Sequence, residues 1–198
     1  MKGAIHKIMK KPSIIFVRHG NTALNEDGDK IRGWIDVPLS PKGEKEAEET
    51  GKKLKGVKAY GIISSDLKRA KQTTEAIRKE TKLPVLGFTK SLRPWHAGEL
   101  AGKEANKIIS ELNNYIDNPD KKIPEGESFN SFKKRMLGFM KELRKVYPTE
   151  VLIVVSHHRD NVLMDAWKDK DYNKELDIDT NRVKQRGISP SEIQIYNY

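Results

Sequence analysis

The chain contains no cysteine among its 198 residues. This absence excludes disulfide bonds, zinc sites built on thiolates and thiol nucleophiles. The first apolar run, residues 14–17, is too short for a signal-peptide core or a membrane span, so we expect a cytoplasmic protein with no membrane contact. No group of carboxylates has the spacing of metal ligands, and we predict neither a metal site nor a cofactor.

Acidic residues are in the minority, with 28 Asp and Glu against 38 Lys and Arg, so the net charge is +10. Such a charge attracts anions in general without selecting one. Four lysines precede Pro12 with no acidic residue among them, which predicts a flexible basic arm over residues 1–12. Aromatic and basic residues do not alternate regularly. The charge alone therefore neither excludes a nucleic-acid partner nor favours one.

The chain has no internal repeat, no low-complexity linker and no shift in composition along its length. Its length fits one α/β domain with a substantial core, so we predict a single domain over residues 1–198. Hydrophobic residues make up 36% of the chain and charged residues 33%, which indicates a folded protein with a heavily charged surface.

Short apolar runs predict strands, and the segments between them have helical spacing. The expected strands are 13–17, 59–63, 85–88, 151–155 and 192–196. The expected helices are one from Pro41, capped by Ser40, to about residue 56, one capped by residues 64–66, and others over 103–116, 129–143 and up to 167. Strands that alternate with helices are typical of an α/β fold of three layers, with a mostly parallel sheet covered on both faces.

Two of the predicted strands end in histidine. Arg18 and His19 follow the first strand, and His157 follows the strand 151–155. Ligands of open α/β sheets bind beyond the carboxyl ends of the strands, and Arg69 is expected in the first turn of a nearby helix. Neutral imidazole is a nitrogen nucleophile, and guanidinium groups bind phosphate oxygens in pairs. Each residue alone fits an ordinary structural role, but together they suit phosphoryl transfer.

Six segments between residues 13 and 157 resemble the histidine phosphatase superfamily, also called phosphoglycerate mutase-like. The segments are Arg18-His-Gly-Asn-Thr22 with Asn25, Gly33-Trp-Ile-Asp-Val-Pro-Leu-Ser-Pro-Lys-Gly43, residues 64–73, residues 92–102, Gly126-Glu-Ser128 and Val154-Val-Ser-His157. The resemblance implies a phosphoglycerate mutase-like fold. It also implies that His19 is the nucleophile that becomes phosphohistidine.

The same resemblance implies roles for the other matching positions. Arg18 and Arg69 would bind the phosphoryl group, and His157 would complete the pocket. Thr22 and Asn25 would contact the substrate or its phosphate. Catalysis would then split into phosphoryl transfer to His19 and attack by water on the phosphoenzyme.

The chain departs from the family pattern at two positions. Many members carry a glutamate two residues after Leu92 that acts as general acid, but this chain has Pro94 there, and proline cannot donate a proton. His96 and Glu99 are the candidate replacements, and an ordinary loop contact is an equal reading for each. The second departure is His158, where the family more often has glycine. His158 is the alternative to His157 as the pocket residue and is also a candidate for substrate selection.

The sequence predicts a metal-independent phosphatase that acts on a small phosphorylated substrate. A phosphomutase is one alternative, although the short segment 103–126 favours hydrolysis, because mutases that depend on a cofactor have a longer insertion there. A second alternative is a phospho-ligand-binding protein whose turnover Pro94 has removed. A scaffold for nucleic acid or an acidic partner ranks below these. Sugar phosphates, nucleotides, phosphorylated cofactors and phosphoproteins stay open as substrates, as does the oligomeric state.

Overall fold

The computed structural model describes residues 12–167, 178, 180–184 and 189–197, so the predicted basic arm lies outside the described residues except for Pro12. A five-stranded sheet occupies the centre of the fold, with the strand order β3-β2-β4-β1-β5. Strands β1 to β4 run parallel, and β5 is antiparallel to β1. The strands are β1 (Ser13–Arg18), β2 (Gly61–Ser65), β3 (Val85–Thr89), β4 (Val151–Ser156) and β5 (Ile193–Asn197).

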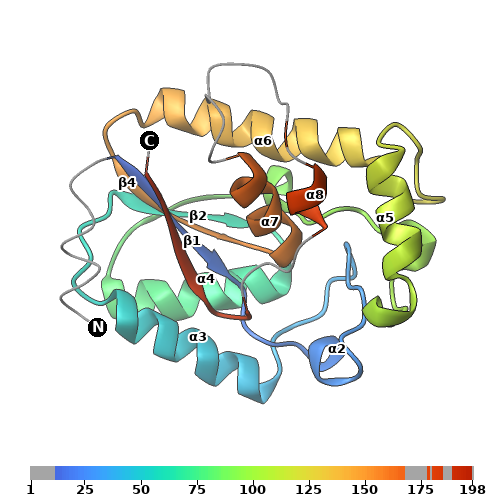
Figure 1. Ribbon diagram of the computed structural model, residues 1–198. Helices are drawn as coiled ribbons and strands as arrows, with labels where there is room; N and C mark the ends of the chain where they lie inside the picture. The colour runs from blue at the N-terminus through green and yellow to red at the C-terminus, as the bar shows by residue number, and fades with distance from the viewer. Residues whose placement is uncertain (1–11, 168–177, 179, 185–188, 198) are drawn as a thin grey trace.

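Helices cover both faces of the sheet (Figure 1). The alternation along β1 explains why: Ile15 and Val17 point into a core shared with α3 (Pro41–Leu54) and α4 (Lys68–Thr81). Ile14 and Phe16 point to the other face, into the core that holds the remaining long helices. These are α5 (Ile109–Asp117), α6 (Phe129–Val146) and α7 (His158–Trp167). The predicted three-layer α/β architecture is confirmed.

Serine caps begin two of these helices, and the cap by Ser40 was expected. Ser40 Oγ accepts the N–H of Gly43 at 3.2 Å and so caps α3, while Ser128 Oγ accepts the N–H of Ser131 at 3.2 Å and caps α6. The apolar spacing of 129–143 predicts a buried stripe of Phe129, Phe132, Met136, Phe139, Met140 and Leu143. The structure buries all of these except Phe139, which is half-buried, and it also buries Leu137.

Two element boundaries differ from the predictions. Residues 64 and 65 extend β2 instead of capping α4, because both serines are fully buried at the strand end, and Asp66 forms an ion pair with Arg93 at 2.7 Å instead. The expected helix 103–116 is divided into a short 3₁₀ turn and α5. The short elements are α2 (Ala23–Glu26), η1 (Lys90–Leu92), η2 (Gly98–Leu100), η3 (Ala105–Lys107) and α8 (Thr180–Val183).

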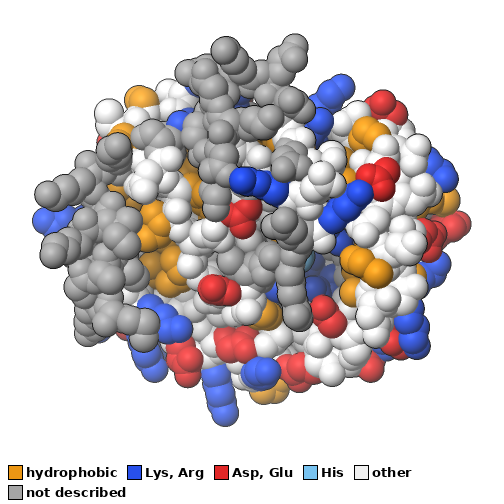
Figure 2. Space-filling view, viewed as in Figure 1, with side chains coloured by type: hydrophobic (Ala, Val, Ile, Leu, Met, Phe, Trp, Pro, Cys, Tyr) orange, Lys and Arg blue, Asp and Glu red, His pale blue; other side chains and the backbone are white. Residues whose placement is uncertain are grey.

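The surface carries both signs of charge side by side. Figure 2 shows Lys and Arg side chains interspersed with Asp and Glu over the face in view. That face therefore has no broad patch of a single sign. In the part of the chain that the structure describes, no helix is both long enough and apolar enough to cross a membrane.

Candidate active site

The register of the two central strands brings the two histidines together. Arg18 pairs with Ser156 across β1 and β4, so the residues that follow, His19 and His157, leave the same edge of the sheet. The backbone N–H of His19 donates to Ser156 O at 3.0 Å. The imidazole centroids of His19 and His157 are 5.0 Å apart, and both side chains are buried. The two predicted histidines therefore form one site.

A single hydrogen bond determines the tautomer of His19. Its Nδ1 lies 2.7 Å from the carbonyl oxygen of Gly20, which can only accept, so Nδ1 carries the proton of the neutral ring. The lone pair of the ring is then on Nε2. Burial, followed by the charges of Arg69, Arg18 and Arg32, lowers the pKa of His19 well below its ordinary value of 6.5. At neutral pH the side chain is therefore uncharged.

Close backbone packing holds the turn after His19. A Cβ on Gly20 would lie 2.4 Å from the carbonyl oxygen of Gly43, and a Cβ on Gly43 would lie 1.9 Å from that of Asn21. Only glycine allows this approach between the turn and the first turn of α3. Asn21 is held there by Glu46, which accepts from its backbone N–H at 2.9 Å and from Nδ2 at 2.6 Å.

Two backbone carbonyls orient the guanidinium of Arg69. Its Nη1 donates to Ile35 O at 2.7 Å and its Nη2 to Gly33 O at 3.0 Å. The group is buried, and burial, followed by the charge of Arg32, lowers the pKa of Arg69 to about 9. It therefore stays a cation at neutral pH. The buried Nε has no hydrogen-bond partner among the described residues.

His157 has one nitrogen bound and one without a partner. Its Nε2 lies 2.8 Å from Ser65 Oγ, while its buried Nδ1 finds no partner within the described part of the chain. Burial, followed by the charge of Arg69, lowers the pKa of His157 well below 6.5. Buried polar atoms of a site are normally hydrogen-bonded. The unpartnered nitrogens of His157 and Arg69 therefore suit a bound anion such as a phosphoryl group.

Arg32 is a cation of the site that the sequence did not single out. Its side chain is 12% exposed, and Nη1 lies 3.4 Å from Asp29 Oδ1, a mostly exposed carboxylate. Arg32 contributes to the lowered pKa of His19, of Arg69 and of His157. The feature of the sequence that could have identified Arg32 is its position directly before Gly33, the residue whose carbonyl orients Arg69.

The Pro94 loop is anchored through its carbonyl groups. Arg135 Nη1 donates to the carbonyls of Ser91 at 3.0 Å and Arg93 at 2.8 Å, and its Nη2 donates to Pro94 O at 3.3 Å. Trp34 Nε1 also donates to Pro94 O, at 2.8 Å. These bonds hold Pro94 in place. Pro94 has no group that ionises, and it stands at the sequence position where many family members carry the acidic glutamate.

The structure links neither candidate acid to the two histidines. His96 packs edge-on against Trp34, with ring centroids 4.3 Å apart, and its Nδ1 accepts the N–H of Gly98 at 3.3 Å. Glu99 is exposed in η2. Within the described residues, no hydrogen bond joins either side chain to His19 or His157.

Thr22 and Asn25 are bonded to each other. Asn25 Oδ1 accepts from both the backbone N–H and the hydroxyl of Thr22, at 3.1 and 3.0 Å, and these bonds cap α2. Asn25 Nδ2 donates to Asp29 at 3.2 Å. His158 contacts the site through Arg18, whose Nη1 lies 3.3 Å from His158 Nδ1. His158 therefore touches a residue of the site, while His157 faces His19 directly.

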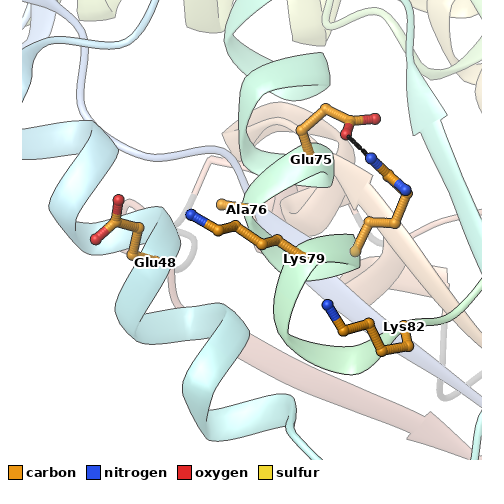
Figure 3. A pocket seen from close by; sticks show the side chains of 6 residues that line it. Glu48, Glu75, Ala76, Lys79 and Lys82 are labelled. Carbon is orange, nitrogen blue, oxygen red and sulfur yellow. Dashed lines mark hydrogen bonds and ion pairs between the residues drawn. The ribbon is translucent and has the colours of Figure 1, made fainter.

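A surface hollow lies between α3 and α4, toward the C-terminal end of α4 and away from Arg69 at its start. Figure 3 shows Lys79 extending from α4 toward Glu48 on α3, with Glu75 in an ion pair beside them. Mixed charges line it, and it has no part in the histidine site. Across the described ranges, no group of three or more His, Asp or Glu side chains is placed to hold a metal ion.

The chain belongs to the histidine phosphatase superfamily, branch 1, whose family model matches residues 14–183. It is 29% identical over 145 residues to a protein called uncharacterized phosphatase PhoE of Bacillus subtilis strain 168, covering 73% of this chain and 71% of the relative. It is 30% identical over 149 residues to a protein of Escherichia coli O1:K1 called probable phosphoglycerate mutase GpmB, covering 73% and 68%.

Solved structures share the fold at lower identity. A mycobacterial glucosyl-3-phosphoglycerate phosphatase superposes with a TM-score of 0.75 at 21% identity, covering 94% of this chain and 90% of that one. The alpha-ribazole phosphatase of Shigella flexneri gives 0.74 at 21% identity, covering 92% and 89%. The expected family and the phosphoglycerate mutase-like fold are therefore confirmed.

Proposed function

We propose that this protein hydrolyses a phosphate monoester through a phosphohistidine intermediate on His19. The observation that carries the proposal is the hydrogen bond from His19 Nδ1 to Gly20 O, which leaves Nε2 as the unprotonated atom among guanidinium groups. A nucleophile of lowered pKa beside fixed cations is what in-line attack on phosphorus needs. Membership of a phosphatase superfamily supports the same reaction.

In the first step, Nε2 of His19 attacks phosphorus and forms a P–N bond while the ester P–O bond breaks. The electron pair of the broken bond leaves with the alcohol oxygen. Arg69 and Arg18 neutralise the charge on the equatorial oxygens, and His157 lies beside the transferred group. The Gly20 carbonyl accepts from Nδ1 throughout, so it holds the ring in position as the phosphohistidine becomes cationic.

In the second step, water attacks phosphorus, the P–N bond breaks, and its electron pair returns to Nε2. The products are inorganic phosphate, a proton released from the water and free His19. The same guanidinium groups serve both steps. No metal or cofactor takes part in this scheme.

The leaving group gets no proton from position 94. We therefore expect hydrolysis to depend steeply on the acidity of the departing alcohol, with aryl phosphates cleaved much faster than alkyl phosphates. The natural substrate that we propose is a small phosphorylated molecule. Thr22, Asn25, His96 and His158 stay candidates for contact with it, and Glu99 with His96 stay candidates for the acid.

The test compares the release of phosphate from an aryl phosphate by the native protein and by His19→Ala. We expect the substitution to lower kcat by at least about 10³-fold, because the nucleophile is lost. Rapid quenching of the native protein should also capture phosphate in an acid-labile, alkali-stable bond. Lys134→Ala, on an exposed face of α6, is the control. Equal rates for native protein and His19→Ala would refute the proposal.

Two observations support alternatives to a phosphatase, and the test includes both. Relatives named as mutases favour a phosphomutase, and product analysis with phosphoglycerates separates the two, since a mutase interconverts them with little free phosphate. Pro94 favours a protein that binds phosphorylated ligands without turnover. Negligible release from the aryl ester by both proteins, together with a rise in melting temperature on addition of phosphate, would establish binding instead.

A further inference from the structure

A chain of three buried groups connects the strand that carries His157 to the Pro94 loop. Ser156 Oγ lies 3.0 Å from the carbonyl oxygen of Leu92. The same hydroxyl forms a hydrogen bond with Asp160 Oδ2, on the first turn of α7. All three residues are completely buried. Asp160 matches none of the motifs singled out in the sequence, and the proposed reaction has not used it.

The hydrogen count of this chain identifies the protonation state of Asp160. A hydroxyl has one proton, and both a carbonyl oxygen and a carboxylate can only accept. If Asp160 were ionised, the single proton of Ser156 would face two acceptors. If Asp160 is neutral, its carboxyl proton goes to Ser156 Oγ, and the proton of Ser156 goes to Leu92 O. Only the neutral acid satisfies all three groups.

The surroundings of the carboxyl group agree with this count. Its second oxygen, Oδ1, is buried with no hydrogen-bond partner in the described part of the chain, which is costly for a carboxylate. Burial raises the pKa of Asp160 to about 8. The hydrogen bond with Ser156, the charge of Arg135 on α6 and the backbone N–H of His157 oppose the rise, and Glu127 adds to it. The carboxyl group also interacts with the charge of Arg69 on α4.

We propose that Asp160 is a positioning residue for the phosphoryl transfer proposed above, and that its neutral carboxyl group holds the Pro94 loop against the strand end that carries His157. The hold works through Ser156, which bonds Leu92 O with its side chain and the N–H of His19 with its own carbonyl. When Asp160 loses its proton, its carboxylate accepts the hydroxyl proton of Ser156. The carbonyl of Leu92 then has no donor, and the loop separates from the histidines. The protein thereby acquires an alkaline limit of activity that does not arise from the nucleophile.

The decisive variant is Asp160→Asn, because an amide donates to Ser156 Oγ as the neutral acid does and cannot ionise. We expect kcat/KM of the native enzyme for an aryl phosphate to fall about tenfold between pH 7 and pH 9, as the protonated fraction falls. Asp160→Asn should stay within about twofold of the native value at pH 7 and should keep only the fall of about twofold by pH 9 that follows from the lowered pKa of Arg69, about 9. Ser156→Ala removes the link and should lower kcat at every pH.

Asp165→Asn is the matched control, since it makes the same change on the same helix at a half-buried residue that bonds Gln194. It should keep the alkaline fall. A second readout follows the Asp160 carboxyl carbon by ¹³C NMR, and we expect it to titrate near pH 8 in the native protein. Titration below pH 6, or a tenfold alkaline fall in Asp160→Asn, would overturn the proposal.

The design separates this inference from the proposed function. If the native protein releases no phosphate, the hydrolytic proposal fails, but the ¹³C titration still measures the state of Asp160. The affinity for inorganic phosphate then replaces kcat/KM. Positioning predicts that native affinity weakens between pH 7 and pH 9 relative to that of Asp160→Asn, and parallel curves for the two proteins would refute it.

Discussion

At the scale of single residues, burial and the positive charges of three arginines keep the histidines of this site neutral. Arg18, Arg32 and Arg69 are three guanidinium groups whose fields reach His19, and each favours its uncharged form. Of the three, Arg69 is held by two carbonyls, whereas Arg32 has an ion pair at 3.4 Å with a mostly exposed partner. Arg32 can therefore turn toward an incoming anion at a smaller cost than Arg69.

Arg32→Gln should weaken the binding of inorganic phosphate by about tenfold, which corresponds to about 1.4 kcal/mol. It should also raise the pKa of His19, because a nearby positive charge is lost, so the acidic limb of the rate profile moves to higher pH. Calorimetric titration and a pH profile of kcat/KM measure the two effects. Arg78→Gln, which makes the same change on the surface of α4, is expected to alter neither. An unchanged affinity would show that Arg32 does not contact the phosphate.

The sequence indicated some of these residues and not others for a physical reason. Arg18, His19 and His157 follow apolar strands, and Arg69 starts a helix, so strand ends and chemistry together predicted that they would meet. Asp160 has no such signal. Its burial depends on the packing of residues 92 and 156, which lie far apart in the sequence, and an aspartate near a helix start is ordinarily a solvated cap.

At the scale of elements, the Pro94 loop is held in place by α6, a helix that comes later in the sequence. Arg135 on α6 donates to four carbonyl groups of the loop region, those of residues 90, 91, 93 and 94, and is paired with Glu127 at 2.5 Å. The guanidinium also lies 5.7 Å from the ring centre of Trp34, which bonds the same Pro94 carbonyl. One helix thus positions the segment whose Leu92 carbonyl bonds Ser156, next to His157.

Arg135→Met should lower the free energy of unfolding by about 1–3 kcal/mol, because several buried carbonyls lose a charged donor. The same change should lower kcat, since the loop is no longer held. Urea unfolding and aryl phosphate hydrolysis are the measurements. Lys134→Met, at an exposed neighbouring position, should change neither. If kcat stays native while stability falls, the loop does not position the reaction.

Helical periodicity predicted the buried stripe of α6 but not the role of its polar side. From the sequence, Arg135 is expected to be an ordinary solvated charge. Helical periodicity separates the apolar face from the polar face, but it does not predict which groups the polar side chains contact. The end of β2 was missed for a related reason. Ser64 and Ser65 match a helix cap as well as a strand end, and only the pairing of both residues with β3, which the sequence does not show, distinguishes the two.

For the whole molecule, the buried titratable groups determine how stability varies with pH. The pKa values of His19 and His157 are lowered in the folded state, so the unfolded state binds more protons below pH 6.5 and acid destabilises the fold. Asp160 acts with the opposite sign. Its pKa is raised from 3.8 to about 8, so the unfolded state has already lost a proton that the folded state keeps, and stability falls as pH rises toward 8.

We therefore expect these three groups to give a maximum in the free energy of unfolding near pH 6.5. Each group contributes a slope of up to about 1.4 kcal/mol per pH unit, so two histidines outweigh Asp160 on the acid side, and Asp160 acts alone above. Urea unfolding of native protein and Asp160→Asn between pH 5.5 and 8.5 checks this. The two stability curves should diverge as pH rises, and curves that run parallel would contradict it.

The position of β1 between β4 and β5 affects how the sheet forms while the protein is being synthesised. Strand β1 ends at residue 18, but its neighbours β4 and β5 begin at residues 151 and 193. The N–H of Ser191 also binds the carbonyls of Arg18 and His19, at 3.0 and 3.2 Å. During translation the apolar β1 therefore waits with both edges unpaired for most of the chain, which is the situation in which nascent strands aggregate. His19 acquires these backbone contacts only when the segment up to β5 has left the ribosome.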